Sequence, residues 1–226
     1  GLMATKTRQS KKALLGKKVG MTRIFDESGK HVPVTVIQAG PCVITQVKTE
    51  EKDGYAAVQL GFDDVRKPRK RPQQAVLDKL GAGPKRILRE VPWIDPADLG
   101  SADGDGEVVP GAELRITAFE GVARVDVGGI SKGRGFSGSV RRHGFATGDK
   151  SHGGKSVRLR GSTGMHTDPG RVLKGTRMAG QYGAVKRKAM NLDVVRIDAE
   201  DNLLVVKGSV PGPNGGYLYI EESLKS

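Results

Sequence analysis

The chain has 226 residues, which suffice for one core or for one core with an appendage. Its formal net charge is +13, and only 4% of its residues are aromatic. Its single cysteine, Cys42, excludes an internal disulfide and a cysteine-based zinc site, and no apolar run is long enough to span a membrane. The surplus of Lys and Arg favours a polyanionic partner, either a nucleic acid or an anionic membrane surface.

The first part of the chain, residues 14–62, predicts short β-strands joined by tight turns. Its candidate strands are rich in β-branched residues and are bounded by Gly, Pro and Asp. They cover residues 19–25, 32–38, 42–48 and 55–62. Several short strands with such turns indicate an antiparallel sheet or a barrel.

Residues 63–107 differ in character and predict a small α/β and loop insertion within the β domain. A basic loop runs from Arg66 to Arg71, and a short helix is expected from Gln73 to Leu80, ending at Gly81. A second helix is expected from Pro84 to Glu90, followed by an acidic, Gly-rich solvated loop at residues 95–107. The basic loop and the basic N-terminal stretch, residues 6–18, are compatible with solvated charge and with RNA contact alike.

Strand patterns return in the last third of the chain, on both sides of a long basic segment. The expected strands cover residues 113–117, 121–130, 192–197, 203–207 and 217–220, with a turn at 198–202. We therefore predict a mostly β protein whose β domain is split into residues 1–130 and 191–226. Residues 131–190, the basic segment, interrupt it.

The basic segment holds nearly all of the net charge. It contains fourteen Lys or Arg against two acids, Asp149 and Asp168, so it accounts for +12 of the +13. It shows neither a helical nor a two-residue period, and it is too polar to fold alone. Such a segment can become ordered against a polyanion, so we predict an arm that threads through RNA. A disordered basic linker is the alternative.

Two motifs in the basic segment resemble nucleotide-binding loops. Gly133 to Gly138 matches G-x-G-x-x-G, but a dinucleotide site needs a helix next and an acid about 20 residues later. Ser139 to Gly144 is a poor helix former; a helix after Gly138 would support this rival. Residues 149–156 resemble a P-loop, yet Asp149 occupies the place of its first glycine.

Three histidines, His143, His152 and His166, also lie in the basic segment. Their spacings of nine and fourteen, without nearby carboxylates or cysteines, fit no common metal site. No nucleophile and base are paired by spacing either. We therefore expect no catalysis, no metal, no cofactor and no small-molecule substrate.

The candidate functional residues follow from the chemistry of RNA. Arg and Lys neutralise phosphates, and Arg and His can stack on unpaired bases. Gly133, Gly135 and Gly170 are expected to allow close approach of the backbone. His143 and His152 are expected to hydrogen-bond or stack. The residues expected to contact phosphates are Arg141, Arg142, Arg158, Arg160, Arg171, Lys174 and Arg177, with further contacts at Lys132, Arg134, Lys150, Lys155, Lys186 and Arg187.

The motifs of the basic segment resemble those of a known family, the universal large-subunit ribosomal protein L-three family. The resemblance also covers Leu15 to Thr22, which is similar to the family's opening, and two pieces that are similar to its closing hairpin. The similar pieces span nearly the whole chain in order. They are residues 133–138, 141–145, 151–153, 169–172 and 174–180, and, in the closing hairpin, 198–204 and 206–213.

The resemblance implies a translation-protein-type β-barrel with a small inserted α/β region and a long irregular basic extension. It implies that the extension runs through large-subunit rRNA toward the peptidyl-transferase centre, with its tip near residues 158–168. It also implies binding near the 3′ end of that rRNA, an early part in subunit assembly, and neighbouring ribosomal proteins as partners. The location implied is the cytoplasmic ribosome, with an organellar ribosome as the alternative.

Two places depart from the family's pattern. Some bacterial members carry a methylated Gln two residues before the Pro-Gly pair, where this chain has Thr167, so that modification is expected to be absent. Residues 184–188 are more basic than is usual in the family, so its contacts are not carried over there. A nucleic-acid-binding protein outside the ribosome remains the alternative function.

Overall fold

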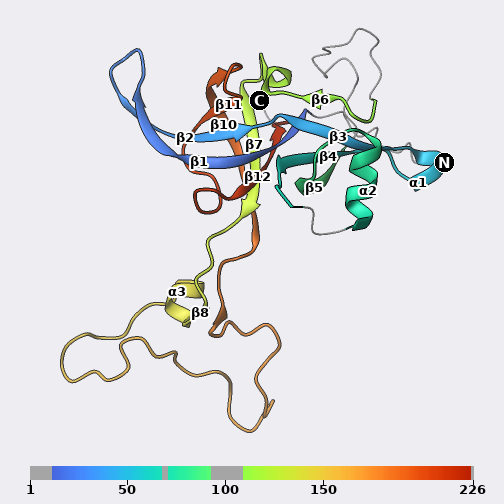
Figure 1. The fold of residues 1–226 in the computed structure, drawn as a ribbon. Coiled ribbons are helices and arrows are strands. Elements are labelled where there is room, and N and C mark those ends of the chain that lie inside the picture. The colour runs from blue at the N-terminus through green and yellow to red at the C-terminus, as the bar shows by residue number, and fades with distance from the viewer. Residues whose placement is uncertain (1–11, 68–70, 93–108, 225–226) are drawn as a thin grey trace, which may run out of the picture. The chain divides into compact units, whose positions relative to one another are not determined.

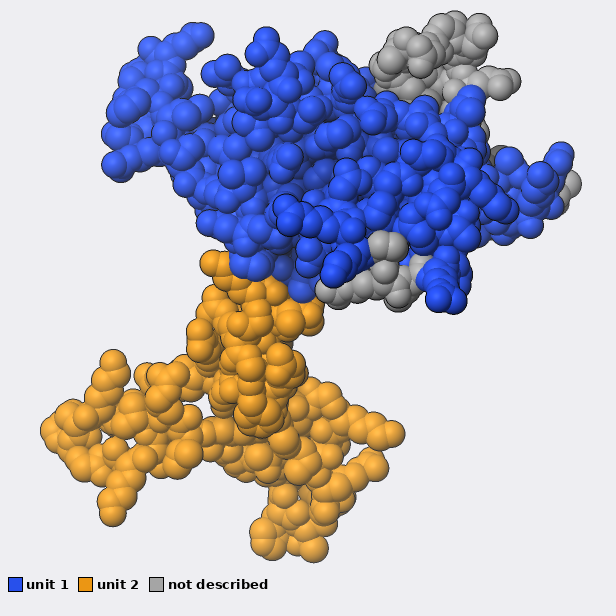
Figure 2. Space-filling model, viewed as in Figure 1, with its two compact units in different colours: residues 1–130, 186–226 blue, residues 131–185 orange. Residues whose placement is uncertain are grey.

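The structure, a computed structural model, describes residues 12–67, 71–92 and 109–224. The chain divides into two compact units, one made of residues 1–130 and 186–226 and the other of residues 131–185. Figure 2 colours the first unit blue and the second, which we call the extension unit, orange. The predicted mostly β fold class is confirmed.

Six strands of the first unit close into a barrel (Figure 1). Every neighbouring pair is antiparallel, and the order around the barrel is β1-β12-β7-β10-β11-β2. The strands are β1 (Ala13–Phe25), β2 (His31–Ala39), β7 (Arg124–Ile130), β10 (Lys186–Asp198), β11 (Leu203–Lys207) and β12 (Tyr217–Glu222).

The barrel core is formed by the side chains that point inward from its strands. Leu204 and Val206 of β11 point inward and are fully buried, as are Val127 of β7 and Ile220 of β12. Each such side chain contributes roughly 1.5–3 kcal/mol relative to an exposed one. A Cβ on Gly16 would lie only 2.7 Å from the carbonyl oxygen of Gln38, so β1 and β2 need glycine at this close approach.

A second sheet packs its apolar residues into the same core. Its strand order is β5-β4-β3-β6, and Ile44, Leu60 and Phe119 belong to one buried cluster with the barrel residues. The elements of this region are β3 (Cys42–Lys48), α1 (Glu50–Asp53), β4 (Ala57–Asp64), α2 (Arg71–Lys79), β5 (Lys85–Pro92), β6 (Glu113–Leu114) and the 3₁₀ turn η2 (Ile116–Phe119).

Most predicted strands are confirmed, and two segments differ. Residues 84–90 were expected to be helical, but they belong to β5, which pairs with β4 from Lys85↔Asp64 to Pro92↔Ala57. The pairing with a long neighbouring strand outweighs a weak local helix preference. The strand expected at 113–117 ends at Leu114 and continues as η2. The helix expected at 73–80 is α2.

Several predictions fall on residues that the structure does not describe. The acidic loop predicted at 95–107 lies outside the described residues, as do Arg69 and Lys70 of the basic loop and residues 6–11 of the N-terminal stretch. None of the helices in ranges 12–67, 71–92 and 109–224 has the length and apolarity needed to span a bilayer.

The extension unit contains little regular structure. Its elements are β8 (Phe136–Ser137), α3 (Ser139–His143) and β9 (Gly180–Gln181), and β8 pairs antiparallel with β9. A helix therefore does follow Gly138, contrary to expectation, but it has five residues and ends at Gly144. All strand pairs in the described part of the chain are antiparallel, so no βαβ unit surrounds the G-x-G-x-x-G motif there.

Candidate nucleic-acid interface

The two ends of the extension unit are joined by backbone hydrogen bonds. Ser131 donates its N–H to the carbonyl of Val185 at 2.9 Å, and Arg134 donates to Tyr182 at 2.9 Å. Tyr182 in turn donates to Gly135 at 2.9 Å. We call residues 131–145 and 176–185 the stem, and residues 146–175 the outer loop.

A glycine permits the closest approach inside the stem. Gly183 is buried and has a φ of +74°, and a Cβ there would lie 2.1 Å from the carbonyl oxygen of Lys132. No other residue fits this position without moving the backbone. The two strands of the stem are therefore held in one register by a residue that sequence reasoning did not single out.

Two predicted RNA-binding residues make bonds within the stem. The Arg142 guanidinium donates from Nη1 to the carbonyl oxygen of Met178 at 2.8 Å. The Nε2 atom of His143 lies 2.9 Å from the same oxygen. Both side chains come from the last turn of α3, which Gly144 ends in the left-handed conformation. In the structure, these two side chains hold α3 against residues 176–185 of the stem.

Two further predicted cations also have partners inside the extension unit. The Arg134 guanidinium lies over the ring of Tyr182, 5.7 Å from its centroid, in a cation–π contact. Arg160 donates from Nη1 to the carbonyl oxygen of Arg177 at 2.7 Å and so ties the outer loop to the stem. Each guanidinium keeps other donors, because arginine carries five.

The remaining predicted cations of the extension unit are exposed. Within the described residues, none of its cations forms an ion pair with a carboxylate. The unit carries eleven Lys or Arg against Asp149 and Asp168, a net charge of +9. The exposed residues are Lys132, Arg141, Lys150, Lys155, Arg158, Arg171, Lys174 and Arg177. Such a concentration of uncompensated charge attracts polyanions.

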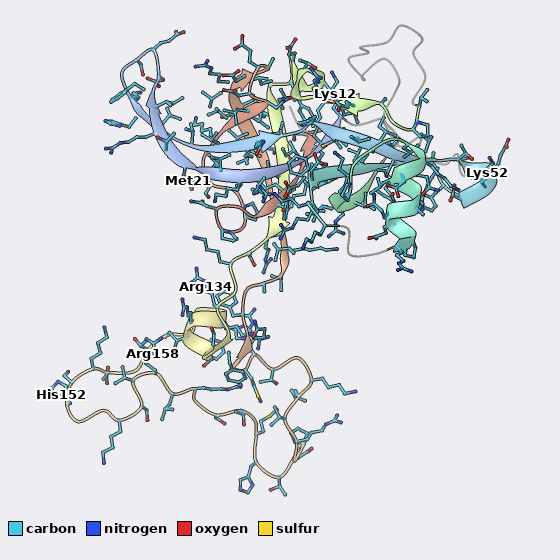
Figure 3. The ribbon with its side chains drawn as sticks, in the orientation of Figure 1. Lys12, Met21, Lys52, Arg134, His152 and Arg158 are labelled. Carbon is cyan, nitrogen blue, oxygen red and sulfur yellow. The ribbon has the colours of Figure 1, made fainter. Side chains whose placement is uncertain are left out.

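The predicted glycines and histidines of this unit lie at its surface. Gly133, Gly135 and Gly170 are exposed. His152 projects from the outer loop (Figure 3) and is exposed, whereas His143 is half-buried in the stem. Among the described residues, no group of His, Cys, Asp and Glu is arranged to hold a metal.

Lys186 and Arg187 lie outside the extension unit. They were predicted within the basic segment, but β10 begins at Lys186, and the two residues pair with Ile130 and Gly129 of β7. Both side chains are exposed on the barrel. The last five residues of the predicted basic segment, 186–190, therefore belong to this strand.

Exposed apolar side chains of the extension unit were not anticipated from the sequence. Phe136 is 81% exposed, Leu159 is 70% exposed and Met165 is 68% exposed. The sequence did contain a signal for this exposure. These large apolar residues follow neither a two-residue nor a 3.6-residue period, so they do not form a face that could pack into a core. Beside cations, such side chains offer surfaces on which unpaired bases can stack.

A cluster of charges lies beside the bulge of β10, where its pairing with β7 shifts register between Ala189 and Leu192. The Lys188 ammonium is 3.1 Å from Asp126 Oδ2 and also contacts the carboxylate of Glu221. Burial opposes ionisation of Asp126, but the backbone N–H of Asn191 and the Lys188 ammonium outweigh it, and the pKa of this carboxyl lies below its usual value. The cluster stabilises the barrel, and its two carboxylates leave no uncompensated positive charge for a polyanion.

Comparison with known proteins identifies the family. A family model described as "Ribosomal protein L3" matches residues 113–217, which include the whole extension unit. Two curated relatives named "Large ribosomal subunit protein uL3", from Synechococcus sp. and Synechococcus elongatus, are each 54% identical over 210 residues, covering 92% of this chain and 93% of the relative. At this identity and coverage, the chain belongs to the ribosomal protein L3 family, uL3.

Proposed function

We propose that the chain binds large-subunit rRNA through the extension unit and thereby fixes the packing of RNA segments in the large ribosomal subunit. Membership of the uL3 family gives it a structural, non-enzymatic role in that subunit. The observation that carries the proposal is the net charge of +9 on residues 131–185, whose cations form no ion pairs among the described residues. Neutralising rRNA phosphates releases counterions, which drives binding.

The finer points of the proposal come from the resemblance to the family. The barrel is of the translation-protein type, and the six closed strands support this. The extension unit points its outer loop, with residues 158–168 at the tip, toward the peptidyl-transferase centre. The protein binds near the 3′ end of the rRNA, acts early in assembly, contacts neighbouring ribosomal proteins and works on the cytoplasmic ribosome.

Removal of the extension unit tests its role directly. Ile130 and Lys186 are register partners in β7 and β10, so an Asn-Gly turn can replace residues 131–185 and close a hairpin. We expect a folded barrel with an unchanged unfolding midpoint but little salt-sensitive affinity for an rRNA transcript, because most phosphate contacts are gone. Filter binding at several KCl concentrations measures this. Retention of the full salt-sensitive affinity would contradict the proposal.

Sedimentation separates the ribosomal function from general nucleic-acid binding. The tagged full chain is expected to migrate with large subunits in a sucrose gradient of a cell extract. If it stays at the top of the gradient while large subunits migrate into it, the protein works outside the ribosome.

A further inference from the structure

A groove lies between helix α2 and strand β5 of the first unit, far along the sequence from the extension unit. It has a volume of about 530 Å³. Leu77, 2% exposed, holds α2 in place, and together with Ile87 and Leu88 it gives the groove an apolar floor. In the described part of the chain, strand β5 is the outer strand of its sheet and pairs with β4 alone. The groove is thus open along one edge of the second sheet.

The rim of the groove is basic. Among the described residues, Lys67, Lys85, Arg86 and Arg89 line it, and no Asp or Glu does. Lys85 donates to Asp64 at 2.7 Å and is neutralised. Across ranges 12–67, 71–92 and 109–224, the other three form no ion pair, so the groove keeps three uncompensated positive charges.

Two acids of this region keep their charge, but among the described residues neither forms an ion pair with a cation of the groove. Asp78 of α2 accepts a hydrogen bond from Gln74, and Asp63 accepts one from the Tyr217 hydroxyl. Gln73, on the groove side of the first turn of α2, is exposed, and its amide can both donate and accept hydrogen bonds. The groove therefore combines cations, an amide and an apolar floor, and the described residues that line it include no carboxylate.

We propose that this groove is a second RNA-binding site, which takes a phosphate backbone segment of large-subunit rRNA. The proposal rests on the proposed function, since it assumes that the protein binds this RNA. Arg86 and Arg89 both line the groove and are both exposed, so the phosphates of one RNA segment bound along this edge strand can contact them. Guanidinium groups can also stack on unpaired bases of RNA. An acidic protein surface has no such bases, so this contact favours RNA as the occupant.

Removal of both groove arginines measures their contribution to RNA binding. Both side chains are exposed, so the full-length R86Q/R89Q variant is expected to fold with an unchanged unfolding midpoint. With a protein-free transcript of large-subunit rRNA as the probe, the slope of log K against log salt is expected to become shallower by roughly 1.4–1.8. The matched control R115Q/R196Q removes two exposed arginines that are paired with Glu113 and Asp198, and is expected to change the slope little.

Three outcomes of this assay are decisive. Equal slopes for R86Q/R89Q and R115Q/R196Q overturn the proposal. An unchanged slope together with poorer incorporation into subunits also overturns it, because the groove then binds a neighbouring acidic protein. The exposed pair R158Q/R171Q reports on the extension unit: if it too leaves the slope unchanged, the proposed function fails, whereas a loss there alone refutes only the groove.

The single cysteine permits a second, independent test by directed cleavage. Cys42 is fully buried, and burial raises the pKa of its thiol to about 12, so it is a poor target for thiol reagents. A Gln73→Cys variant can therefore be labelled selectively with iron–EDTA at the groove and reconstituted into subunits. We expect rRNA strand cleavage above the background given by the unmodified sequence treated identically. Cleavage no higher than that background would refute the site.

Discussion

Asp126 shows how one carboxylate can hold an irregular strand in place. Strand β10 is bulged between Ala189 and Leu192, and there the backbone N–H of Asn191 donates to Asp126 Oδ1 at 2.8 Å. The φ of Asn191 is +55°, a left-handed conformation that asparagine tolerates better than most residues. The other carboxylate oxygen of Asp126 contacts Lys188, so a single side chain satisfies both the bulge and the cation.

The Asp126→Asn variant is expected to lose about 1–3 kcal/mol of unfolding free energy, because Lys188 keeps only Glu221 and the charge-assisted bond weakens. The folded-state pKa of Asp126 is lowered, so its contribution is present above the ordinary carboxyl pKa of about 3.9 and is lost as the pH falls through the folded value. Urea unfolding from pH 3 to pH 7 measures both effects. Asp201→Asn, in an exposed turn, is the control. Equal losses in the two variants would contradict the role of Asp126.

At the scale of elements, the stem is held by contacts between residues distant in sequence. Arg142 and Met178 are 36 positions apart, and Arg134 and Tyr182 are 48 apart. Side-chain bonds to a backbone carbonyl fix α3 against the returning chain without a hydrophobic core. Two neighbouring arginines therefore differ in role. Arg142 is half-buried and bonds within the stem, whereas Arg141 is exposed and can contact a ligand.

The Arg142→Gln and Arg141→Gln variants are expected to behave differently, although each removes one positive charge. Arg142→Gln should loosen the stem, with amide exchange at Arg134 and Tyr182 faster by roughly tenfold, because a bond from a charged donor contributes about 1.5–3 kcal/mol. Arg141→Gln should leave that exchange unchanged and lower RNA affinity only. Hydrogen exchange followed by NMR reports on these two amides in the full chain. Equal exchange in both variants would show that Arg142 does not hold the stem.

Local patterns predicted those strands that are rich in β-branched residues and bounded by turn residues. Residues 42–48 and 203–207 have the same bounds in the prediction and in the structure, because Gly40-Pro41 precedes the first, a turn at 198–202 precedes the second and Gly208 follows it. Residues 84–90 did not follow their local pattern, since β4 supplies the hydrogen-bonding partner of β5. The charge of the candidate interface was readable from composition, whereas the bonds of Arg142 and Arg160 depend on pairing across the stem.

At the scale of the whole molecule, charge is divided unequally between the two units. The extension unit carries +9 of the net +13, which leaves +4 for the first unit, although that unit is three times longer. The first unit buries an apolar core, while the outer loop of the extension unit, residues 146–175, has neither a strand nor a helix. The apolar core and most of the net charge thus lie in different parts of the sequence.

Limited trypsin digestion of the free full-length chain should reveal this division. Within the described residues, we expect the first cuts in the outer loop, at Lys150, Lys155 or Arg158, because exposed backbone without regular hydrogen bonds opens most easily. The nicked barrel should stay folded, since β7 and β10 remain paired with each other and with β12 and β11. An rRNA transcript should slow these cuts at least tenfold, as an ordered loop bound to RNA is protected. Mass spectrometry identifies the sites. Unchanged cleavage rates with bound rRNA would mean that the outer loop does not contact it.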